Sequence, residues 1–468
     1  MESEDYKPDY KDKSSTLQDR PSIDSLHRII EDQIADEKFD EIRETLKTLH
    51  PAEIADLMSG FGALKKNIVF DLVPREIQHE VLIELEESDQ EDLLERMSEE
   101  EIGDILENLD SDDAADVAAL LDEPVRSRVL ESTADEDRKE VEHLLGYDEE
   151  SAGGLMSLEM VTVPDHASVN EAIKAVRYAR EKVGIDDIHY VYMVDDDLRL
   201  LGGVTILDLL LADRNRPVHE LKYKDLITIP SGLDQEEVAQ RFQRYDLISA
   251  PVVNDKGQLV GRITIDDIVD VIQDEAQEDI GYLGGTGEEE VGERNILKAS
   301  SLRLPWLLVS FVGELMNVFL IARYEMTLAN LIIIAFFIPI IIAVAGNVGI
   351  QSSTIVIRGL ASGEIPLHHT FRRVLREVLV GTLNGTIIAL ALGIVIFFWK
   401  QEVRISIAVG ASMICVVIIA AITGSLTPIL LKKTKQDPAH ACGPFITVTN
   451  DVIGLAIYMF ITTSILLQ

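Results

Sequence analysis

The chain has 468 residues and a formal net charge of −40, which is too long and too acidic for one ordinary domain. From residue 301 onward there are seven Asp or Glu and eleven Lys or Arg, which leaves 75 acids and 31 bases in residues 1–300. The net charge is therefore −44 in the first part and +4 in the second. So negative a surface repels nucleic acid and attracts cations. We predict a soluble acidic module, a membrane-embedded carboxyl-terminal part and no nucleic-acid partner.

The beginning of the chain has the composition of a disordered tail. Residues 1–22 are polar and contain several Asp, Lys and Pro. They include no apolar stretch of the kind a secretory signal needs, so we expect no cleaved signal and a cytoplasmic acidic module. Cys415 and Cys442 both fall in the apolar part of the chain and predict no disulfide framework.

Residues 23–150 have the pattern of short amphipathic helices. Segments near Leu49, Ser98 and Ser111 each combine a capping residue, acids in the first turn and apolar residues spaced three and four positions apart. Helices repeated in this way stack on one another to bury their apolar faces. We therefore predict an α-helical superhelical domain over residues 23–150.

A duplicated α/β unit follows Gly153-Gly154. The first copy predicts strands at 160–163, 190–194 and 201–205 with a helix from Val169, and the second predicts strands at 227–229, 249–253 and 260–264 with a helix from Gln235. Each copy ends in Thr-x-x-Asp and a helix. This order resembles a tandem pair of CBS domains, over residues 151–215 and 216–280. The resemblance implies that Asp208 and Thr264 can contact an adenine nucleotide, although many such pairs bind none.

Five apolar segments in the last third are long enough to span a bilayer. They cover about 304–322, 331–356, 378–399, 406–431 and 444–467, and we expect a linking helix over 281–303 before the first. Basic residues are concentrated before the first segment and in the second and fourth loops. Positively charged loops stay on the cytoplasmic side. We therefore predict a multi-pass protein of the cell membrane with its amino terminus inside and its carboxyl terminus outside.

Asp451 is a single carboxylate inside the last of these segments. A charged side chain at the centre of a bilayer costs about 2.5–3.5 kcal/mol on insertion scales, so such residues usually face a partner, a cavity or an ion path. A carboxylate favours a cation path. The alternative is a protonated carboxyl group that packs helices together.

The second apolar segment contains Pro339 and ends in small and polar residues. Gly346 and Gly349 allow close helix approach or expose the backbone, and Asn347 and Gln351 supply amide oxygens at membrane depth. A pore lining and a small-residue packing face are both consistent with this pattern. The neighbouring basic loop and Asp451 favour the pore.

The polar motifs of these two segments resemble those of the MgtE family of magnesium channels and transporters. They are Gly-Asn-x-Gly-x-Gln-Ser-x-Thr from 346, preceded by Pro339, and Asn450-Asp-Val-Ile-Gly, preceded by Asp437-Pro-Ala-His-Ala-Cys-Gly-Pro. The resemblance extends over about 25–468 and includes the order of helical domain, CBS pair, linking helix and five spans. It implies a transporter and not an enzyme. Glu314, a second acid in the first span, has no counterpart in this pattern.

The resemblance implies a homodimer in the bilayer, with a pore at the subunit interface and Asp451 as the main ion-binding residue. Mg²⁺ demands octahedral oxygen ligands and loses water slowly, so paired carboxylates would hold it partly or fully hydrated. The candidate pore residues are Gly346, Asn347, Gly349, Asn450, Asp451 and Gly454.

The resemblance also implies regulatory Mg²⁺ sites in the cytoplasmic domains, where Mg²⁺ acts as regulator as well as substrate. The candidate ligands are Asp112, Asp116, Gly153, Asp234, Glu236, Asp246, Asp266, Asp267, Asp270, Glu275, Glu278, Asp279 and Asp437. Taken singly, each is an ordinary surface acid. Together they predict feedback, in which high cytosolic Mg²⁺ bridges acids that otherwise repel one another and closes the pore.

Two alternatives to a magnesium transporter are consistent with the sequence. The transported ion could be another divalent cation such as Co²⁺, Mn²⁺ or Zn²⁺, although softer metals usually recruit His or Cys. The paired His368 and His369, and His440 with Cys442, lie in loops away from Asp451. A membrane-tethered enzyme or nucleotide sensor is the other alternative, and Thr-x-x-Asp by itself is weak support for it.

Overall fold

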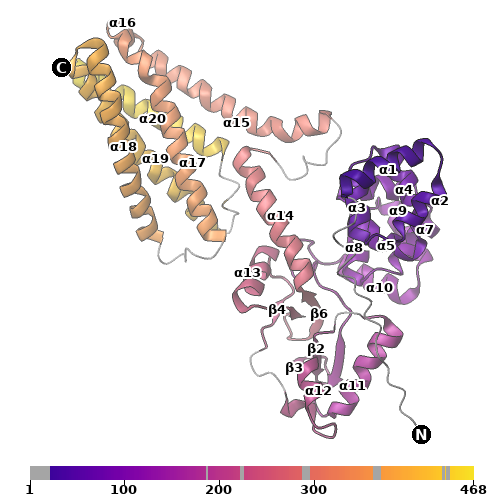
Figure 1. Cartoon of the computed structure of the whole chain (residues 1–468). Coiled ribbons are helices and arrows are strands. Elements are labelled where there is room, and N and C mark those ends of the chain that lie inside the picture. The colour runs from indigo at the N-terminus through magenta and orange to yellow at the C-terminus, as the bar shows by residue number, and fades with distance from the viewer. Residues whose placement is uncertain are drawn as a thin grey trace, which may run out of the picture. The chain divides into compact units, whose positions relative to one another are not determined.

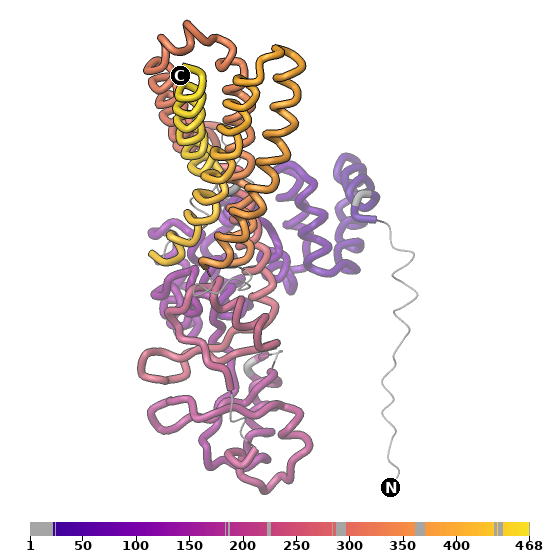
Figure 2. Tube along the Cα trace, turned by 90° about the vertical axis from the view of Figure 1, so that its left-hand side faces the viewer, coloured from indigo at the N-terminus to yellow at the C-terminus, as the bar shows by residue number. Residues whose placement is uncertain are grey.

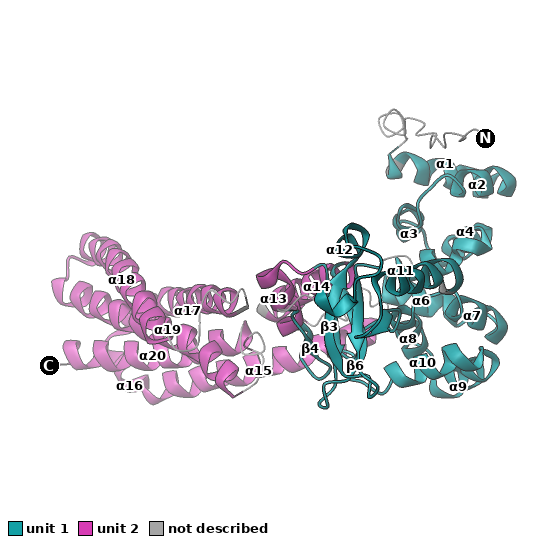
Figure 3. Cartoon of the chain, turned by 90° about the horizontal axis from the view of Figure 1, so that it is seen from below, with its two compact units in different colours: residues 1–235, 248–265 teal, residues 236–247, 266–468 magenta. Residues whose placement is uncertain are grey.

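The structure is a computed structural model that describes residues 22–185, 188–221, 226–286, 296–361, 370–434, 438 and 443–467 (Figure 1). The chain divides into two compact units, which Figure 3 distinguishes by colour. Unit 1 comprises Met1–Gln235 and Ile248–Ile265, and unit 2 comprises Glu236–Leu247 and Asp266–Gln468. The tail predicted at 1–22 lies, except for Ser22, outside the described residues.

Unit 1 begins with a series of short helices. They are α1 (Ile23–Ala35), α2 (Phe39–Leu46), α3 (Pro51–Ser59), α4 (Ala63–Leu72), η2 (Arg75–Ile77), α5 (Gln78–Ile83), α6 (Glu87–Leu94), α7 (Glu99–Leu106), α8 (Ser111–Ala119), α9 (Glu123–Ser132) and α10 (Asp135–Leu144). Capping residues explain where several of these helices begin. His50 with Glu53 opens α3, and Ser98 with Glu101 opens α7, each through reciprocal side-chain and backbone hydrogen bonds. The helical prediction for this region is confirmed.

Apolar residues on the facing sides of these helices form the core. Ile42, Ile54, Val69 and Val129 have no exposed surface. Burial of this kind is the main source of helix stability, because helices this short are marginal by themselves. One charged pair lies inside the same region, where Lys66 of α4 forms an ion pair with Asp89 of α6. A buried charge is tolerated when it is paired.

Two three-stranded sheets follow, each with the same topology. In the first, β1 (Val161–Pro164) pairs parallel to β2 (Tyr190–Val194), which pairs antiparallel to β3 (Leu200–Thr205). In the second, β4 (Ile229–Pro230), β5 (Ser249–Val253) and β6 (Leu259–Thr264) repeat the order. The middle strand of each sheet is irregular at the same place, at Met193/Val194 and at Val252/Val253. The predicted duplication is therefore present down to this detail.

The helices of this region complete the repeated pattern. They are α11 (Val169–Tyr178), η3 (Ala179–Val183), α12 (Ile206–Leu211), η4 (Val218–Glu220), α13 (Gln235–Tyr245) and α14 (Ile265–Gly284). α14 ends before Gly285, whose φ of +73° favours glycine. The linking helix expected over 281–303 is thus not continuous among the described residues. Of the range 281–303, the first residues form the last turn of α14 and the last residues form the first part of α15.

In the part of unit 2 that the structure describes, five helices are long and apolar enough to cross a membrane. They are α15 (Ile296–Arg323), η6 with α17 (Ile332–Phe337, Ile338–Ala361), α18 (Thr370–Lys400), α19 (Val403–Lys433) and α20 (Pro444–Leu466), with the short α16 (Glu325–Asn330) after α15. Pro339 is the second residue of α17, where a missing backbone N–H is tolerated. α20 contacts α15, α17 and α19, and Figure 2 shows its course in yellow. The predicted fold class is confirmed.

Candidate functional site

Two polar residues are buried side by side in α20. Asp451 has 5% of its surface exposed and Asn450 has 2%. A buried carboxylate requires a compensating partner, because burial removes the water that otherwise solvates its charge. The Oδ1 atom of Asp451 has no hydrogen-bond partner among the described residues. The site therefore contains an oxygen whose bonding capacity the described residues leave unused.

Helices α17 and α15 face this carboxylate. A methyl group added at Gly346 of α17 would lie 3.4 Å from Asp451 Oδ1, so the glycine backbone lies close to this carboxylate. Glu314 of α15 lies close enough to interact with Asp451. Its Oε2 accepts a hydrogen bond of 3.2 Å from Asn317 Nδ2. Glu314, which the family resemblance left without a role, is thus an acid next to the candidate ion-binding residue.

Asn450 connects α20 to α19 and α17. Its Oδ1 accepts a hydrogen bond from the Thr423 hydroxyl of α19, and its Nδ2 is buried without a partner among the described residues. A side chain at Gly349 would collide with that Nδ2, and one at Gly424 would collide with the Gly349 backbone. The glycines therefore bring α17, α19 and α20 into close contact, as small residues do between membrane helices.

The structure brings together four of the six candidate pore residues, namely Gly346, Gly349, Asn450 and Asp451. Gly454 is one turn further along α20. Methyl carbons of Ala345 and Val416 lie 3.3 and 3.2 Å from the position its Cβ would take, so it serves close packing. Asn347 lines a separate cavity of about 350 Å³ together with Gln351 and with Asn384 of α18. Asp451 does not line that cavity.

Sequence reasoning missed Thr423, Asn317 and Asn384. Each lies in a long and largely apolar helix, a context in which Thr usually bonds to its own helix backbone. Thr423 also has such contacts, with the carbonyls of Ile419 and Ala420. No spacing in a single sequence reveals that its hydroxyl also reaches Asn450 on another helix.

Among the candidate regulatory residues of unit 1, Gly153 and Asp234 come together. The Gly153 N–H donates to the Ser231 carbonyl at 2.8 Å, and Ser151 and Asp234 form an antiparallel bridge. A side chain at Gly153 would collide with the Tyr147 ring. Two further candidates, Asp112 and Asp116, lie on α8 one turn apart.

Unit 2 holds most of the other candidate ligands. Asp266, Asp267, Asp270, Glu275, Glu278 and Asp279 lie along α14. Burial, and then the charge of Asp266, raises the pKa of Asp270. Asp246 has a φ of 51°, in the left-handed region. Asp437 lies outside the described residues. Among those that are described, no group of three or more His, Cys, Asp or Glu is arranged to hold a metal ion.

Glu236 of α13 has a defined partner in the membrane helices. Its Oε2 is 2.9 Å from Nζ of Lys432, in the last turn of α19. Its other oxygen accepts a hydrogen bond of 3.2 Å from Gln240 Nε2. Both oxygens of this candidate ligand are thus engaged.

An acidic cluster that sequence reasoning missed surrounds Glu159. The Glu159 carboxylate accepts hydrogen bonds from the Ser111 N–H at 3.1 Å, the Ser111 hydroxyl at 2.8 Å and the Ser157 hydroxyl at 2.6 Å. Burial, and then the charge of Glu107 for Asp137 or of Glu159 for Glu140, raises the pKa of these two α10 carboxyls. The junction between α8 and the first CBS unit therefore concentrates negative charge.

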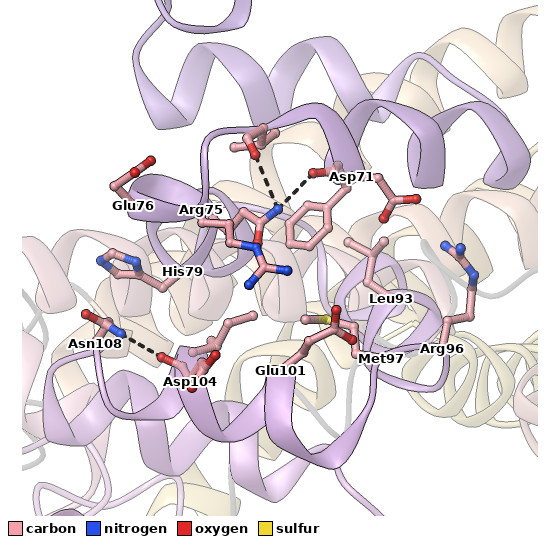
Figure 4. Close-up of a pocket in the computed structure, with 14 residues that line it drawn as sticks. Asp71, Arg75, Glu76, His79, Leu93, Arg96, Met97, Glu101, Asp104 and Asn108 are labelled. Carbon is pink, nitrogen blue, oxygen red and sulfur yellow. Dashed lines mark hydrogen bonds between the residues drawn. The ribbon is translucent and has the colours of Figure 1, made fainter. Parts of the chain in front are cut away.

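The two candidate nucleotide contacts, Asp208 and Thr264, both lie in unit 1. Thr205 donates to Asp208 Oδ2 at 2.7 Å and accepts from the Asp208 N–H at 3.1 Å, so Thr-x-x-Asp caps α12 in the first copy. Thr264, the other candidate nucleotide contact, is buried at the end of β6. A pocket of about 630 Å³ lies between η2, α5 and α7. Figure 4 shows Arg75, His79 and Asp104 among the residues that line it. Burial lowers the pKa of His79.

Comparison with known protein families accounts for three parts of the chain. Residues 338–461 match the MgtE family, described as divalent cation transporters, and residues 49–150 match the MgtE intracellular N domain. Residues 152–215 and 218–274 match the CBS domain. The family matches therefore fall on the membrane helices that hold Asp451, on the helical part of unit 1 and on the duplicated α/β unit.

Similar proteins cover most of the chain. The magnesium transporter MgtE of Thermus thermophilus is 33% identical over 431 residues, which are 91% of this chain and 95% of the relative. That of Enterococcus faecalis is 36% identical over 328 residues, 70% and 72% of the two chains. A solved cytosolic domain of the Mg²⁺ channel MgtE in complex with ATP is 32% identical, covers 52% of this chain and 98% of that one, and has a TM-score of 0.49. The five apolar helices are thus those of a multi-pass membrane protein, and the chain belongs to the MgtE family of divalent cation transporters.

Proposed function

We propose that this chain mediates Mg²⁺ uptake across the cell membrane along a path that passes Asp451. The observation that carries the proposal is the buried Asp451 carboxylate, whose Oδ1 has no partner among the described residues and lies beside Gly346, where a Cβ atom would be only 3.4 Å away. An unused anionic oxygen at membrane depth provides a site for a cation. The relatives that are named magnesium transporters support the choice of Mg²⁺.

The donors around Asp451 suit a hard cation. The described polar groups nearby belong to Glu314, Asn450 and Thr423, which offer oxygen rather than sulfur or imidazole ligands. Mg²⁺ prefers oxygen and usually keeps several waters, so a carboxylate can hold it through those waters. Co²⁺ and Mn²⁺ form the alternative, since neither is excluded by oxygen donors.

A second copy of the chain would complete the site. One carboxylate compensates half of the ion's charge, and a twofold axis beside α20 would place the second Asp451 opposite the first. We therefore propose a homodimer with the ion path at its interface, the amino terminus in the cytoplasm and the carboxyl terminus outside.

Cytosolic Mg²⁺ is the proposed regulator. The acids of α8, of the loop at Asp234 and of α14 offer carboxylate oxygens, which fit Mg²⁺, in a module with a net charge of −44. No complete metal site exists among the described residues, so binding must draw acids together from separate segments. Low Mg²⁺ leaves the acids apart and the path open, and high Mg²⁺ joins them and closes it. We also propose an adenine nucleotide near Asp208 or Thr264 as an additional ligand of the CBS pair.

Ion flux in reconstituted vesicles tests the proposal. Vesicles loaded with a Mg²⁺ indicator should show influx of Mg²⁺ that exceeds influx of Co²⁺ or Mn²⁺ at equal concentration. Influx should fall when Mg²⁺ on the side of the acidic module is raised into the millimolar range. Equal or greater influx of Co²⁺ or Mn²⁺ would favour the alternative ion, and influx insensitive to Mg²⁺ on that side would contradict the regulatory part alone.

A further inference from the structure

The ion pair between Glu236 and Lys432 joins two regions that are 196 residues apart in sequence. Glu236 lies in the first turn of α13, in the second CBS unit, and Lys432 in the last turn of α19, a membrane helix. Both side chains are about 30% exposed, so the pair is shielded in part from water. Gln240, one turn along α13, holds the second Glu236 oxygen and fixes the carboxylate towards the lysine.

The same helix leads from this pair to the candidate ion site. Thr423 lies nine residues before Lys432 in α19, which corresponds to about 14 Å along the helix axis. Its hydroxyl contacts Asn450, the neighbour of Asp451. α19 also approaches α17 at Gly424 and Gly349, so an axial or rotational shift of α19 must change the contacts around Asp451. Close-packed helices transmit such shifts, because their interfaces do not deform continuously.

We propose that the Glu236–Lys432 ion pair is a latch through which the second CBS unit holds the cytoplasmic end of α19, and that divalent cations act on it by competing with Lys432 for Glu236. This inference rests on the proposed regulation by Mg²⁺. A metal ion bound to Glu236 would meet the ammonium group 2.9 Å from the same carboxylate, so like charges repel and the lysine must leave. The latch therefore weakens Mg²⁺ binding at Glu236 and sets the Mg²⁺ concentration at which the path closes.

Removal of the lysine charge should tighten inhibition. In Lys432→Gln, Mg²⁺ no longer displaces an ammonium group, so half-inhibition of influx should occur at about two- to fivefold lower internal Mg²⁺. That range corresponds to the strength of partly exposed ion pairs. Lys433→Gln is the matched control, because Lys433 is the next residue of the same helix, is exposed and forms no ion pair with the described residues. This variant removes the same charge and should leave the internal Mg²⁺ concentration at half-inhibition unchanged.

A double-substitution cycle separates the latch from general electrostatics. In a Glu236→Gln background, Lys432→Gln should produce no further shift, because the competing carboxylate is gone. An equal shift for the Lys432 and Lys433 variants, no shift in the Lys432 variant, or a shift that persists without Glu236 would each overturn the latch.

A second measurement does not depend on regulation. In full-length protein without divalent ions, Glu236→Lys and Lys432→Glu should each lower the melting temperature, and the two together should restore it. Failure of that restoration would contradict the ion pair itself. Restoration in a protein whose influx ignores internal Mg²⁺ would instead contradict the proposed regulation.

Discussion

Gly346 of α17 and Asp451 of α20 stand opposite each other across a helix contact in which no side chain separates them. A Cβ atom at Gly346 would lie 3.4 Å from Asp451 Oδ1 and 3.5 Å from Thr447 Cγ2. The glycine thus leaves space next to a carboxylate oxygen that has no partner among the described residues. We propose that the permeating ion passes beside this carboxylate.

Gly346→Ala should therefore reduce transport without loss of stability. Alanine favours a helix over glycine by about 1 kcal/mol, and 3.4 Å is an ordinary contact distance, so the melting temperature should stay equal or rise. Mg²⁺ influx should fall because the methyl group occupies the space beside the carboxylate. Gly393→Ala is the control, since its nearest neighbour would be the Ser406 carbonyl at 3.8 Å. Equal influx in the two variants would contradict a path at Gly346.

Thr423→Val should impair the site from the side of α19. The variant keeps the shape of the side chain but removes the hydroxyl that donates to Asn450 Oδ1. A buried amide without its partner costs about 1–3 kcal/mol, so both stability and Mg²⁺ influx should decrease. Thr423→Ser, which keeps the hydroxyl, should retain more of both. Thermal melts and influx assays on the two variants provide the measurement, and a serine variant no better than valine would exclude a role for the hydrogen bond.

The acidic cluster at Glu159 predicts a pH dependence of stability. Burial and neighbouring acids raise the folded-state pKa values of Asp137 and Glu140 above their ordinary values. The folded protein therefore binds more protons than the unfolded one between the ordinary and the raised pKa. Its unfolding free energy should decrease as the pH rises through that window, which begins near pH 4.

Replacement of both acids should flatten this dependence. Asp137→Asn with Glu140→Gln should raise the melting temperature at neutral pH and reduce its slope against pH, whereas Glu95→Gln, an exposed acid of the same helical region, should do neither. A double variant with the wild-type slope would assign the pH dependence to other groups.

The acids of unit 2 should determine the response to internal Mg²⁺. Neutralisation of Asp246, Asp267 and Glu275 removes candidate ligands and also removes repulsion. Repulsion between exposed acids is screened over about 8 Å at physiological salt, whereas a bridging ion acts at contact distance. Loss of the ligands should dominate, so influx should persist at high internal Mg²⁺. Asp246→Asn is preferred to alanine there, because asparagine tolerates the left-handed backbone at φ 51°.

The matched control is a triple variant that loses the same three negative charges at another place in the chain. Asp195→Asn, Asp196→Asn and Asp197→Asn remove three charges from the turn between β2 and β3, which contributes no candidate ligand. Inhibition at the wild-type Mg²⁺ concentration in both triple variants would refute feedback through these acids.

The features that sequence predicted best are those with a strong local pattern. Capping residues located α3 and α7, the duplicated strand order located both sheets, and apolar length located five spans. Asp451 was singled out because a charge within an apolar helix is rare, and Gly346 and Gly349 were singled out as small residues that allow close helix approach. Contacts between distant segments were not predictable, since Thr423 with Asn450 and Glu236 with Lys432 depend on helix rotation and packing that one sequence does not encode locally.

The linking helix expected over 281–303 stays a prediction, because residues 287–295 lie outside the described residues, but its first turn belongs to α14, which ends at Gly284. The acidic, amphipathic run from 265 continues without a break to Gly284, so periodicity alone gave little indication of its end. Gly285 ends the helix through its positive φ, and it packs close to Pro444 at the beginning of α20. Sequence showed a glycine-rich stretch there, but not this contact.

Passage of Mg²⁺ by Asp451 is tested most directly by measuring Mg²⁺ influx into vesicles. The vesicles contain equal amounts of wild-type, Asp451→Asn or Asp451→Glu protein. Asparagine has nearly the same shape but no charge, and glutamate keeps the charge on a longer side chain. We expect Mg²⁺ influx to be lost in Asp451→Asn and partly kept in Asp451→Glu. Thermal melting should show that all three proteins are folded. Mg²⁺ influx at the wild-type rate through folded Asp451→Asn protein would contradict an ion path past Asp451.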